Sequence, residues 1–114
     1  SSREDHIVPW RSAYQSRGIL GGETTFVMGA SGHIAGVVNP PATGKRSHWR
    51  NERPAAAAED WLAGATEHKG SWWPHWMEWL KRFAGEEREA RKTLGNKRHK
   101  PIEAAPGRYV KEKA

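Results

Sequence analysis

The chain has 114 residues and a formal net charge of +6, which leaves room for one small domain at most. It contains no cysteine, so its own residues form no disulfide, no thiolate metal site and no cysteine nucleophile. Its hydrophobic fraction of 36% is low for an independent domain, yet its seven tryptophans need surfaces to pack against. We therefore expect a segment whose core is completed by residues outside it.

Composition also bears on membrane and nucleic-acid partners. No stretch approaches the roughly 18 consecutive apolar residues of a membrane span, and the charged start does not resemble a signal peptide. We expect a cytoplasmic protein that was processed or that starts within a longer chain, because its first residue is not Met. Residues 86–114 hold nine Lys and Arg against five Glu. Such a basic tail is usually solvated, and binding of a polyanion is the alternative.

The first third of the chain predicts a loop, a helix, a strand and a turn, in that order. Residues 1–9 form a loop that ends in proline, which suits the first turn of a helix. Apolar spacing predicts that helix over 10–17, and a glycine ends it. The β-forming run 24–28 predicts a short strand. The flexible turn 29–32 then presents His33.

The rest of the chain predicts two helices and a tail. The apolar run 34–38 ends at Asn-Pro-Pro, and 45–49 is a candidate for a second short extended piece. An alanine-rich start predicts a helix over 54–70. A serine cap and a final glycine predict another over 71–85. Four of its aromatic residues form one stripe, which we expect to pack on a core or between domains rather than bind a granule surface or nucleic acid: Trp72, Trp76, Trp79 and Phe83.

These elements predict an α/β architecture with one strand. A lone strand leaves its backbone groups unpaired, so 24–28 should be the edge of a sheet built by residues before Ser1. We expect residues 1–85 to be the C-terminal part of a catalytic domain that is not autonomous. Residues 86–114 should form a basic, loosely packed tail, with Ile102, Tyr109 and Val110 as its only anchors.

Asp5 and His33 are the candidate catalytic residues. They lie 28 residues apart, each on a loop, with one helix and one strand between them. In α/β-hydrolases the acid and the histidine of the triad follow the nucleophile in this order. The acid accepts a hydrogen bond from one imidazole nitrogen, so that the other nitrogen takes a proton from the nucleophile. The alternative makes Asp5 a helix cap and His33 a surface residue.

Five strings carry a resemblance that covers nearly the whole chain. They are EDHIVPW at 4–10, FVMGASGHIAGVVNPP at 26–41, WLAGA at 61–65, GSWWP at 70–74 and APGRYVK at 105–111. Together they resemble the C-terminal region of class I polyhydroxyalkanoate synthases. The segments 43–60 and 86–94 are the least distinctive, and His99 stands where an aromatic Tyr is expected.

The resemblance implies an α/β-hydrolase-type acyltransferase with a Cys–His–Asp triad. Such enzymes polymerise (R)-3-hydroxyacyl-CoA thioesters into a storage polyester and release CoA, without a cofactor. His33 would activate the cysteine, and Asp5 would orient His33 and help to activate the 3-hydroxyl group of the next monomer. His6 is either a supporting neighbour of Asp5 or a packing residue. The six histidines have no recognised metal-ligand spacing, so no metal site is expected.

The family's nucleophile, in a Gly-x-Cys-x-Gly elbow, is not within these residues and would precede them. We therefore expect the chain alone to be inactive. The resemblance further implies a homodimer as the full-length protein and association with polyester granules and granule-associated proteins, without nucleic acid.

Two other functions stay open at this point. One is a catalytically inert, basic, Trp-rich binding module in which Asp5 and His33 are incidental. The other is the C-terminal part of a related α/β-hydrolase esterase, which would carry serine at the missing elbow.

Overall fold

A computed structural model describes residues 1–113 of the chain, which form two compact units. The first unit spans Ser1–Ala84, and the second begins at Gly85. The second unit therefore starts one residue earlier than the tail expected from the sequence.

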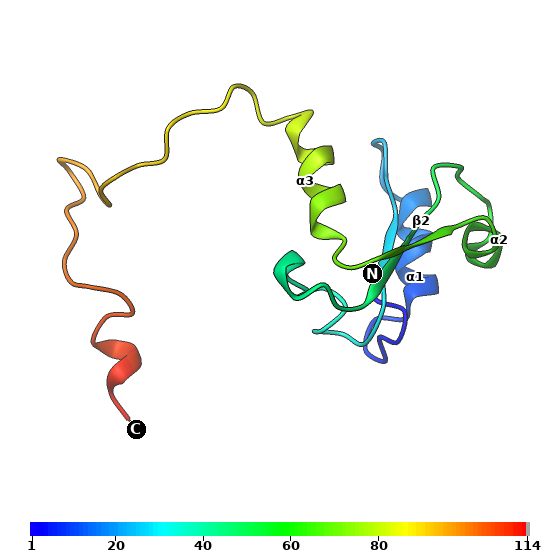
Figure 1. Cartoon of the computed structure of the whole chain (residues 1–114), viewed down its shortest axis with the longest axis horizontal. Coiled ribbons are helices and arrows are strands. Elements are labelled where there is room, and N and C mark those ends of the chain that lie inside the picture. The colour runs from blue at the N-terminus through cyan, green and yellow to red at the C-terminus, as the bar shows by residue number, and fades with distance from the viewer. Residues whose placement is uncertain (114) are drawn as a thin grey trace. The chain divides into compact units, whose positions relative to one another are not determined.

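The first unit contains a small antiparallel sheet and three α-helices (Figure 1). The strand order is β1-β2-β3. In chain order the elements are α1 (Trp10–Gln15), a 3₁₀ helix (Ser16–Gly18), β1 (Val27–Gly29), a 3₁₀ helix (Pro41–Thr43), β2 (Ser47–Arg50), α2 (Ala58–Ala63), β3 (Thr66–Lys69) and α3 (Trp73–Lys81).

The expectation of a sheet with one strand from this chain was wrong, although the candidate extended piece at 45–49 overlaps β2. β1 pairs with β2, and β2 pairs with β3, so the sheet has three strands among the described residues. β3 was missed because its four residues are polar and mostly exposed, and therefore show no apolar alternation. The helix predicted over 54–70 was also too long. It ends at Ala63, because Gly64 follows and the next residues pair with β2.

The apolar core lies between α1, α2 and one face of the sheet. It consists of five buried side chains: Trp10, Tyr14, Met28, Ala58 and Trp61. The Phe26 ring meets the rings of Tyr14 and Trp61 edge to face, with centroid distances of 5.1 and 4.9 Å. The Tyr14 hydroxyl donates a hydrogen bond to the Ala55 carbonyl at 2.7 Å, and this bond holds the segment before α2 against α1.

The opposite face of the sheet is polar and carries α3. Side chains alternate between faces along a strand, so Trp49 of β2 packs against the core while its neighbour Arg50 reaches His75 of α3. α3 begins at Trp73, two residues after the predicted start, and its N-cap is Trp72, which makes no side-chain cap bond. The Ser71 hydroxyl accepts a hydrogen bond from the Trp73 amide at 3.1 Å. α3 ends at Lys81, short of the predicted glycine, and none of its residues is buried.

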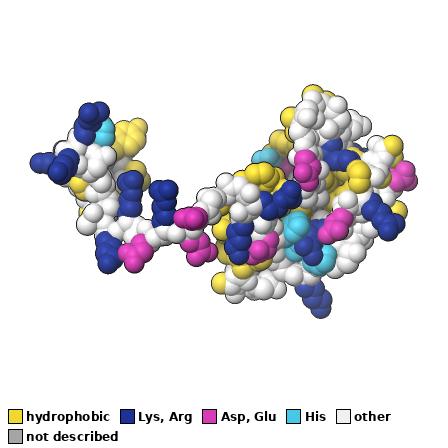
Figure 2. All heavy atoms as spheres, turned by 90° about the horizontal axis from the view of Figure 1, so that it is seen from above, with side chains coloured by type: hydrophobic (Ala, Val, Ile, Leu, Met, Phe, Trp, Pro, Cys, Tyr) yellow, Lys and Arg dark blue, Asp and Glu magenta, His cyan; other side chains and the backbone are white. Residues whose placement is uncertain are grey.

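The second unit is a basic segment with one short element, a 3₁₀ helix at Tyr109–Lys111. Lys and Arg side chains outnumber acidic ones along it (Figure 2). The side chains expected to anchor it, Ile102, Tyr109 and Val110, are 89%, 87% and 69% exposed. None of the helices in residues 1–113 has the length and apolar character to cross a membrane.

The thin core leads to a prediction about the isolated chain. Only two of the seven tryptophans, Trp10 and Trp61, are buried, whereas a stable domain must offset a large loss of chain entropy by apolar burial. We expect the isolated chain to show no cooperative thermal transition by circular dichroism or calorimetry. A sharp transition with equal calorimetric and van't Hoff enthalpies would contradict this expectation.

Candidate active site

The N-terminal residues run alongside β1 and form the base of the site. The Ser1 amine donates to the Val27 carbonyl at 3.0 Å, and the Gly29 amide donates to the Ser1 carbonyl at 2.8 Å. The Arg3 amide then donates to the Gly29 carbonyl at 2.8 Å, and Ser2 pairs with Gly29 in parallel. Two segments that run in the same direction leave a sheet at the same end. The loops after Arg3 and after Gly29 therefore start side by side.

Asp5 lies on the first of these loops and is held by backbone donors. Its Oδ1 accepts hydrogen bonds from the amides of Ile7 and Val8, both at 2.9 Å. The carboxylate does not cap α1, which begins at Trp10 and has no side-chain cap. Its side chain is 7% exposed. The Val8 amide, followed by His33 and the Ile7 amide, lowers the Asp5 pKa to about 2 against the opposing effect of burial.

His33 lies on the second loop and meets the other oxygen of Asp5. Its Nδ1 is 2.8 Å from Oδ2, and its side chain is 44% exposed. A carboxylate only accepts hydrogen bonds, so Nδ1 carries the proton and donates it. Nε2 is then left as the acceptor in the neutral imidazole. The hydrogen bond expected between Asp5 and His33 is thus present, and it leaves one nitrogen able to take a proton.

The loop that carries His33 has an unusual backbone conformation. Ser31 has a φ of +79°, in the left-handed region that non-glycine residues seldom adopt. Its carbonyl accepts a hydrogen bond from the Glu4 amide at 3.2 Å, so the two loops are also tied to each other by backbone. His6 is exposed, and the structure gives it no hydrogen bond to Asp5 or His33.

Sequence reasoning missed a second cluster of titratable side chains around Arg50. The guanidinium donates to Nδ1 of His75 at 2.8 Å and to Nδ1 of His68 at 3.0 Å. His48 stacks on His68, with ring centroids 5.3 Å apart. The sequence could have indicated this cluster only through the pairing of β2 with β3, which places His48 opposite His68. Because β3 was not predicted, this pairing was not predicted either.

The chemistry of this cluster favours neutral histidines and does not suit a cation. Arg50 occupies the Nδ1 lone pairs of His68 and His75, and a metal ion would meet its positive charge. Burial, followed by the Arg50 charge, lowers the pKa of His75, and burial also lowers that of His48. Among residues 1–113, no group of three or more acidic or histidine side chains is placed to hold a metal.

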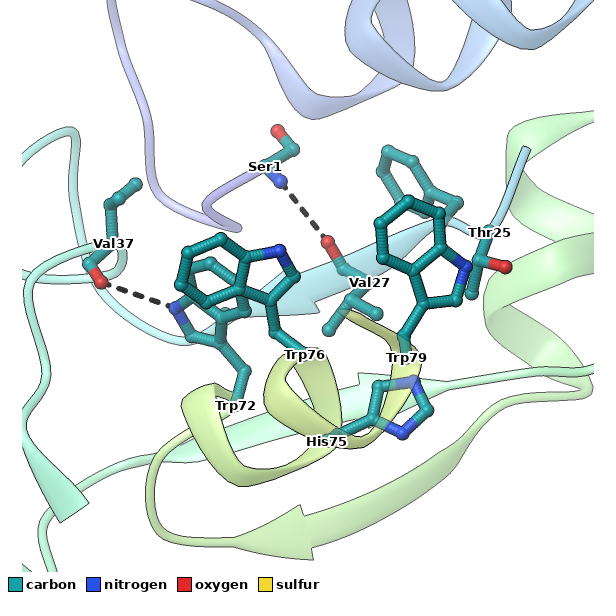
Figure 3. A pocket seen from close by; sticks show the side chains of 10 residues that line it. Ser1, Thr25, Val27, Val37, Trp72, His75, Trp76 and Trp79 are labelled. Carbon is teal, nitrogen blue, oxygen red and sulfur yellow. Dashed lines mark hydrogen bonds between the residues drawn. The ribbon is translucent and has the colours of Figure 1, made fainter. Parts of the chain in front are cut away.

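A cleft of about 400 Å³ lies between α3 and the start of the chain. In Figure 3 the rings of Trp76 and Trp79 from α3, and of Trp72 just before it, project toward β1, beside Val27 and Ser1. Three residues of the predicted aromatic stripe thus line an open cleft, and none of the four is buried. Asp5 and His33 do not line this cleft. Trp72 and Trp73 both donate from the indole nitrogen to the Val37 carbonyl, which ties α3 to the chain beyond His33.

The Asp5 geometry predicts how its carboxyl group titrates. An ordinary Asp with a pKa of about 3.9 is half protonated near pH 4, whereas one with a pKa of about 2 is almost fully ionised there. The stabilisation from this carboxylate is therefore present above about pH 4 and is lost as the pH falls toward 2. In the full-length protein labelled with ¹³C-aspartate, we expect the Asp5 carboxyl shift to stay constant from pH 7 to pH 4. An Asp5→Asn sample assigns the signal, and a midpoint near pH 4 would contradict the two amide bonds.

Comparison with known proteins gives relatives over essentially the whole chain, although no family model matches it. The chain is 59% identical to the poly(3-hydroxyalkanoate) polymerase subunit PhaC of Cupriavidus necator over 113 residues, which are 99% of this chain and 19% of that protein. It is 45% identical to the PhaC subunit of Rhizobium meliloti over 114 residues, all of this chain and 18% of that protein. It is 44% identical to the poly(3-hydroxyalkanoate) polymerase of Methylorubrum extorquens, again over all of this chain and 19% of that protein.

The chain therefore spans about a fifth of the length of the curated relatives it matches. The matched span is 99–100% of this chain, so it covers both loops of the candidate site. The chain belongs to the poly(3-hydroxyalkanoate) polymerase family and is a C-terminal segment of such a polymerase.

Proposed function

We propose that this segment supplies the acid–base half of the active site of a polyhydroxyalkanoate polymerase. The observation that carries the proposal is the 2.8 Å contact between Asp5 and His33, with the second Asp5 oxygen held by two backbone amides. A histidine oriented in this way is a general base, worth about 10²–10⁴-fold in rate. The names of the relatives supply the reaction class.

In the proposed reaction His33 activates a cysteine from another part of the polymerase. Nε2 takes the thiol proton, and the thiolate attacks the carbonyl of an (R)-3-hydroxyacyl-CoA thioester. The acyl–sulfur bond to CoA breaks, and the proton on His33 passes to the departing CoA thiolate. The 3-hydroxyl group of an acyl unit then attacks a second acyl thioester. An ester bond forms, the acyl–sulfur bond of that thioester breaks, and the hydroxyl proton passes through His33 to the departing thiolate. No cofactor takes part, because every proton and electron pair is accounted for by these groups.

Asp5 has two tasks in this scheme, one for each oxygen. Oδ1 fixes the loop through Ile7 and Val8, and Oδ2 fixes the tautomer and orientation of His33. The low pKa of Asp5 keeps it ionised, so it stabilises the imidazolium that forms during each proton transfer. His33 remains 44% exposed in this segment, which leaves room for the nucleophile and the thioester to approach.

The proposal extends to the setting in which the polymerase works. We infer a cytoplasmic enzyme, dimeric as the full-length protein, at the surface of the polyester granule that it makes. The named relatives are all polymerases, which favours this reaction over ester hydrolysis. An inert binding module is disfavoured because it gives no reason for an aspartate and a histidine to meet at 2.8 Å across two loops.

Two substitutions test the proposal in the complete polymerase. In Asp5→Asn the side-chain NH₂ group faces His33 Nδ1 and donates to it, so the imidazole proton moves to Nε2. We expect the rate of polymerisation to fall by about 10⁴-fold. His33→Gln removes the base and should also abolish polymer formation. The measurements are CoA release from (R)-3-hydroxybutyryl-CoA and the thermal unfolding profile, which should stay close to that of the wild type.

The matched controls are His99→Gln and Asp60→Asn, which make the same chemical changes at exposed residues that belong to neither loop. Both controls should release CoA at the wild-type rate. Normal release from Asp5→Asn or His33→Gln would disprove the assignment.

A further inference from the structure

The two loops of the candidate site are each closed by one turn, and these turns meet at Ser2 and Gly36. Asp5 lies three residues after Ser2, and its amide donates to the Ser2 carbonyl at 3.3 Å. His33 lies three residues before Gly36, whose amide donates to the Gly32 carbonyl at 2.9 Å. The contact between Ser2 and Gly36 lies at one end of both turns, and Asp5 and His33 lie at the other end. That contact therefore influences the distance between the Asp5 and His33 side chains.

The contact between Ser2 and Gly36 leaves no room for a larger side chain. Ser2 is 1% exposed. A Cβ atom at Gly36 would lie 2.2 Å from Ser2 Oγ, 2.7 Å from Ser2 Cβ and 2.9 Å from the Ala30 carbonyl oxygen. Real Cβ atoms almost never approach other atoms below 3.0 Å, so something must shift. The Gly36 backbone is not in the left-handed region, and its requirement for glycine is a matter of space alone.

Gly36 is also confined from its other side. A Cβ atom at Gly29 would lie 2.6 Å from the Gly36 carbonyl oxygen. Gly29 ends β1 and pairs with the N-terminal segment through both its amide and its carbonyl group. Gly36 is thus held between the Ser2 side chain and the last residue of the strand, and it cannot move toward either.

The Ser2 side chain acts through its shape. Its Oγ is buried and has no hydrogen-bond partner among the described residues. A hydroxyl buried without a partner is unfavourable, so its polar group does not explain its place. The Ser2 side chain therefore acts through its volume, which fills the space next to Gly36.

We propose that Ser2 and Gly36 are positioning residues whose close contact sets the spacing between the Asp5 carboxylate and His33. This inference rests on the proposed function for its kinetic consequence, but the geometry itself is testable without activity. A side chain at Gly36 moves the loop that carries His33 away from the Asp5 loop. Nδ1 then loses its partner, while groups that bind the substrate elsewhere in the polymerase stay in place.

The test compares Gly36→Ala with the wild type in the complete polymerase. We expect kcat to fall by about 10²-fold, the scale of an ångström-sized misplacement of a catalytic group, with KM within about twofold. The low-field proton resonance of His33 Nδ1–H, assigned by its loss in His33→Gln, should weaken or disappear. Unchanged kcat together with an unchanged resonance would overturn the proposal.

Two further variants separate positioning from general damage. Adding Ser2→Gly to Gly36→Ala removes the two closest atoms but leaves the Ala30 carbonyl, so we expect partial recovery of kcat and of the resonance. Gly32→Ala adds the same methyl group in the same loop, where the nearest atom is 3.7 Å away, and it should behave like the wild type. No recovery from Ser2→Gly, or equal loss in Gly32→Ala, would overturn the proposal.

Two cases need a further readout: misfolding of Gly36→Ala, and failure of the proposed function. Should Gly36→Ala not fold, Ser2→Gly alone tests the same contact by loosening it; a broadened His33 resonance supports the proposal, and an unchanged one overturns it. If Asp5→Asn keeps full activity, the proposed function is wrong. The His33 resonance in Gly36→Ala then still decides whether Ser2 and Gly36 set the spacing.

Discussion

The parallel pairing of residues 1–3 with β1 is the constraint on which the candidate site depends. Asp5 and His33 are 28 residues apart, and no local interaction brings them together. The backbone bonds from Ser1 and Arg3 to Val27 and Gly29 place two strand ends next to each other. Both loops leave the sheet at that end, so one short turn on each side is enough for the carboxylate to reach the imidazole.

The two faces of the sheet serve different purposes. One face is covered by α1 and α2 and holds the apolar core, as Figure 1 shows for the arrangement of these elements. The other face is polar and is joined to α3 through Arg50 and His75. α3 in turn holds the Val37 carbonyl through two indole nitrogens. The loop that carries His33 is therefore supported from the strand before it and from a helix that follows much later in the chain.

The errors of the sequence-based predictions have a common physical origin. β3 and the end of α2 were missed because a polar strand is stabilised by a partner strand and not by its own residue pattern. The aromatic stripe is a different case, because its spacing predicts packing on a core or between domains, and this stays a prediction. In this segment Trp72, Trp76 and Trp79 line an open cleft, because periodicity identifies an apolar face but does not identify what covers it.

Local chemistry in the sequence alone bounded two elements of the fold and indicated a candidate pair of catalytic residues. Pro9 and the glycine after residue 17 bounded the first helix, β-forming residues marked the first strand, and the order of acid and histidine on successive loops named Asp5 and His33. Only the tertiary structure decided which atoms meet. One Asp5 oxygen binds backbone amides while the other binds the imidazole of His33. The histidines gather around Arg50, and Ser2 contacts Gly36. These contacts join residues distant in the chain, and their distances follow from strand register and close packing, which no residue pattern encodes.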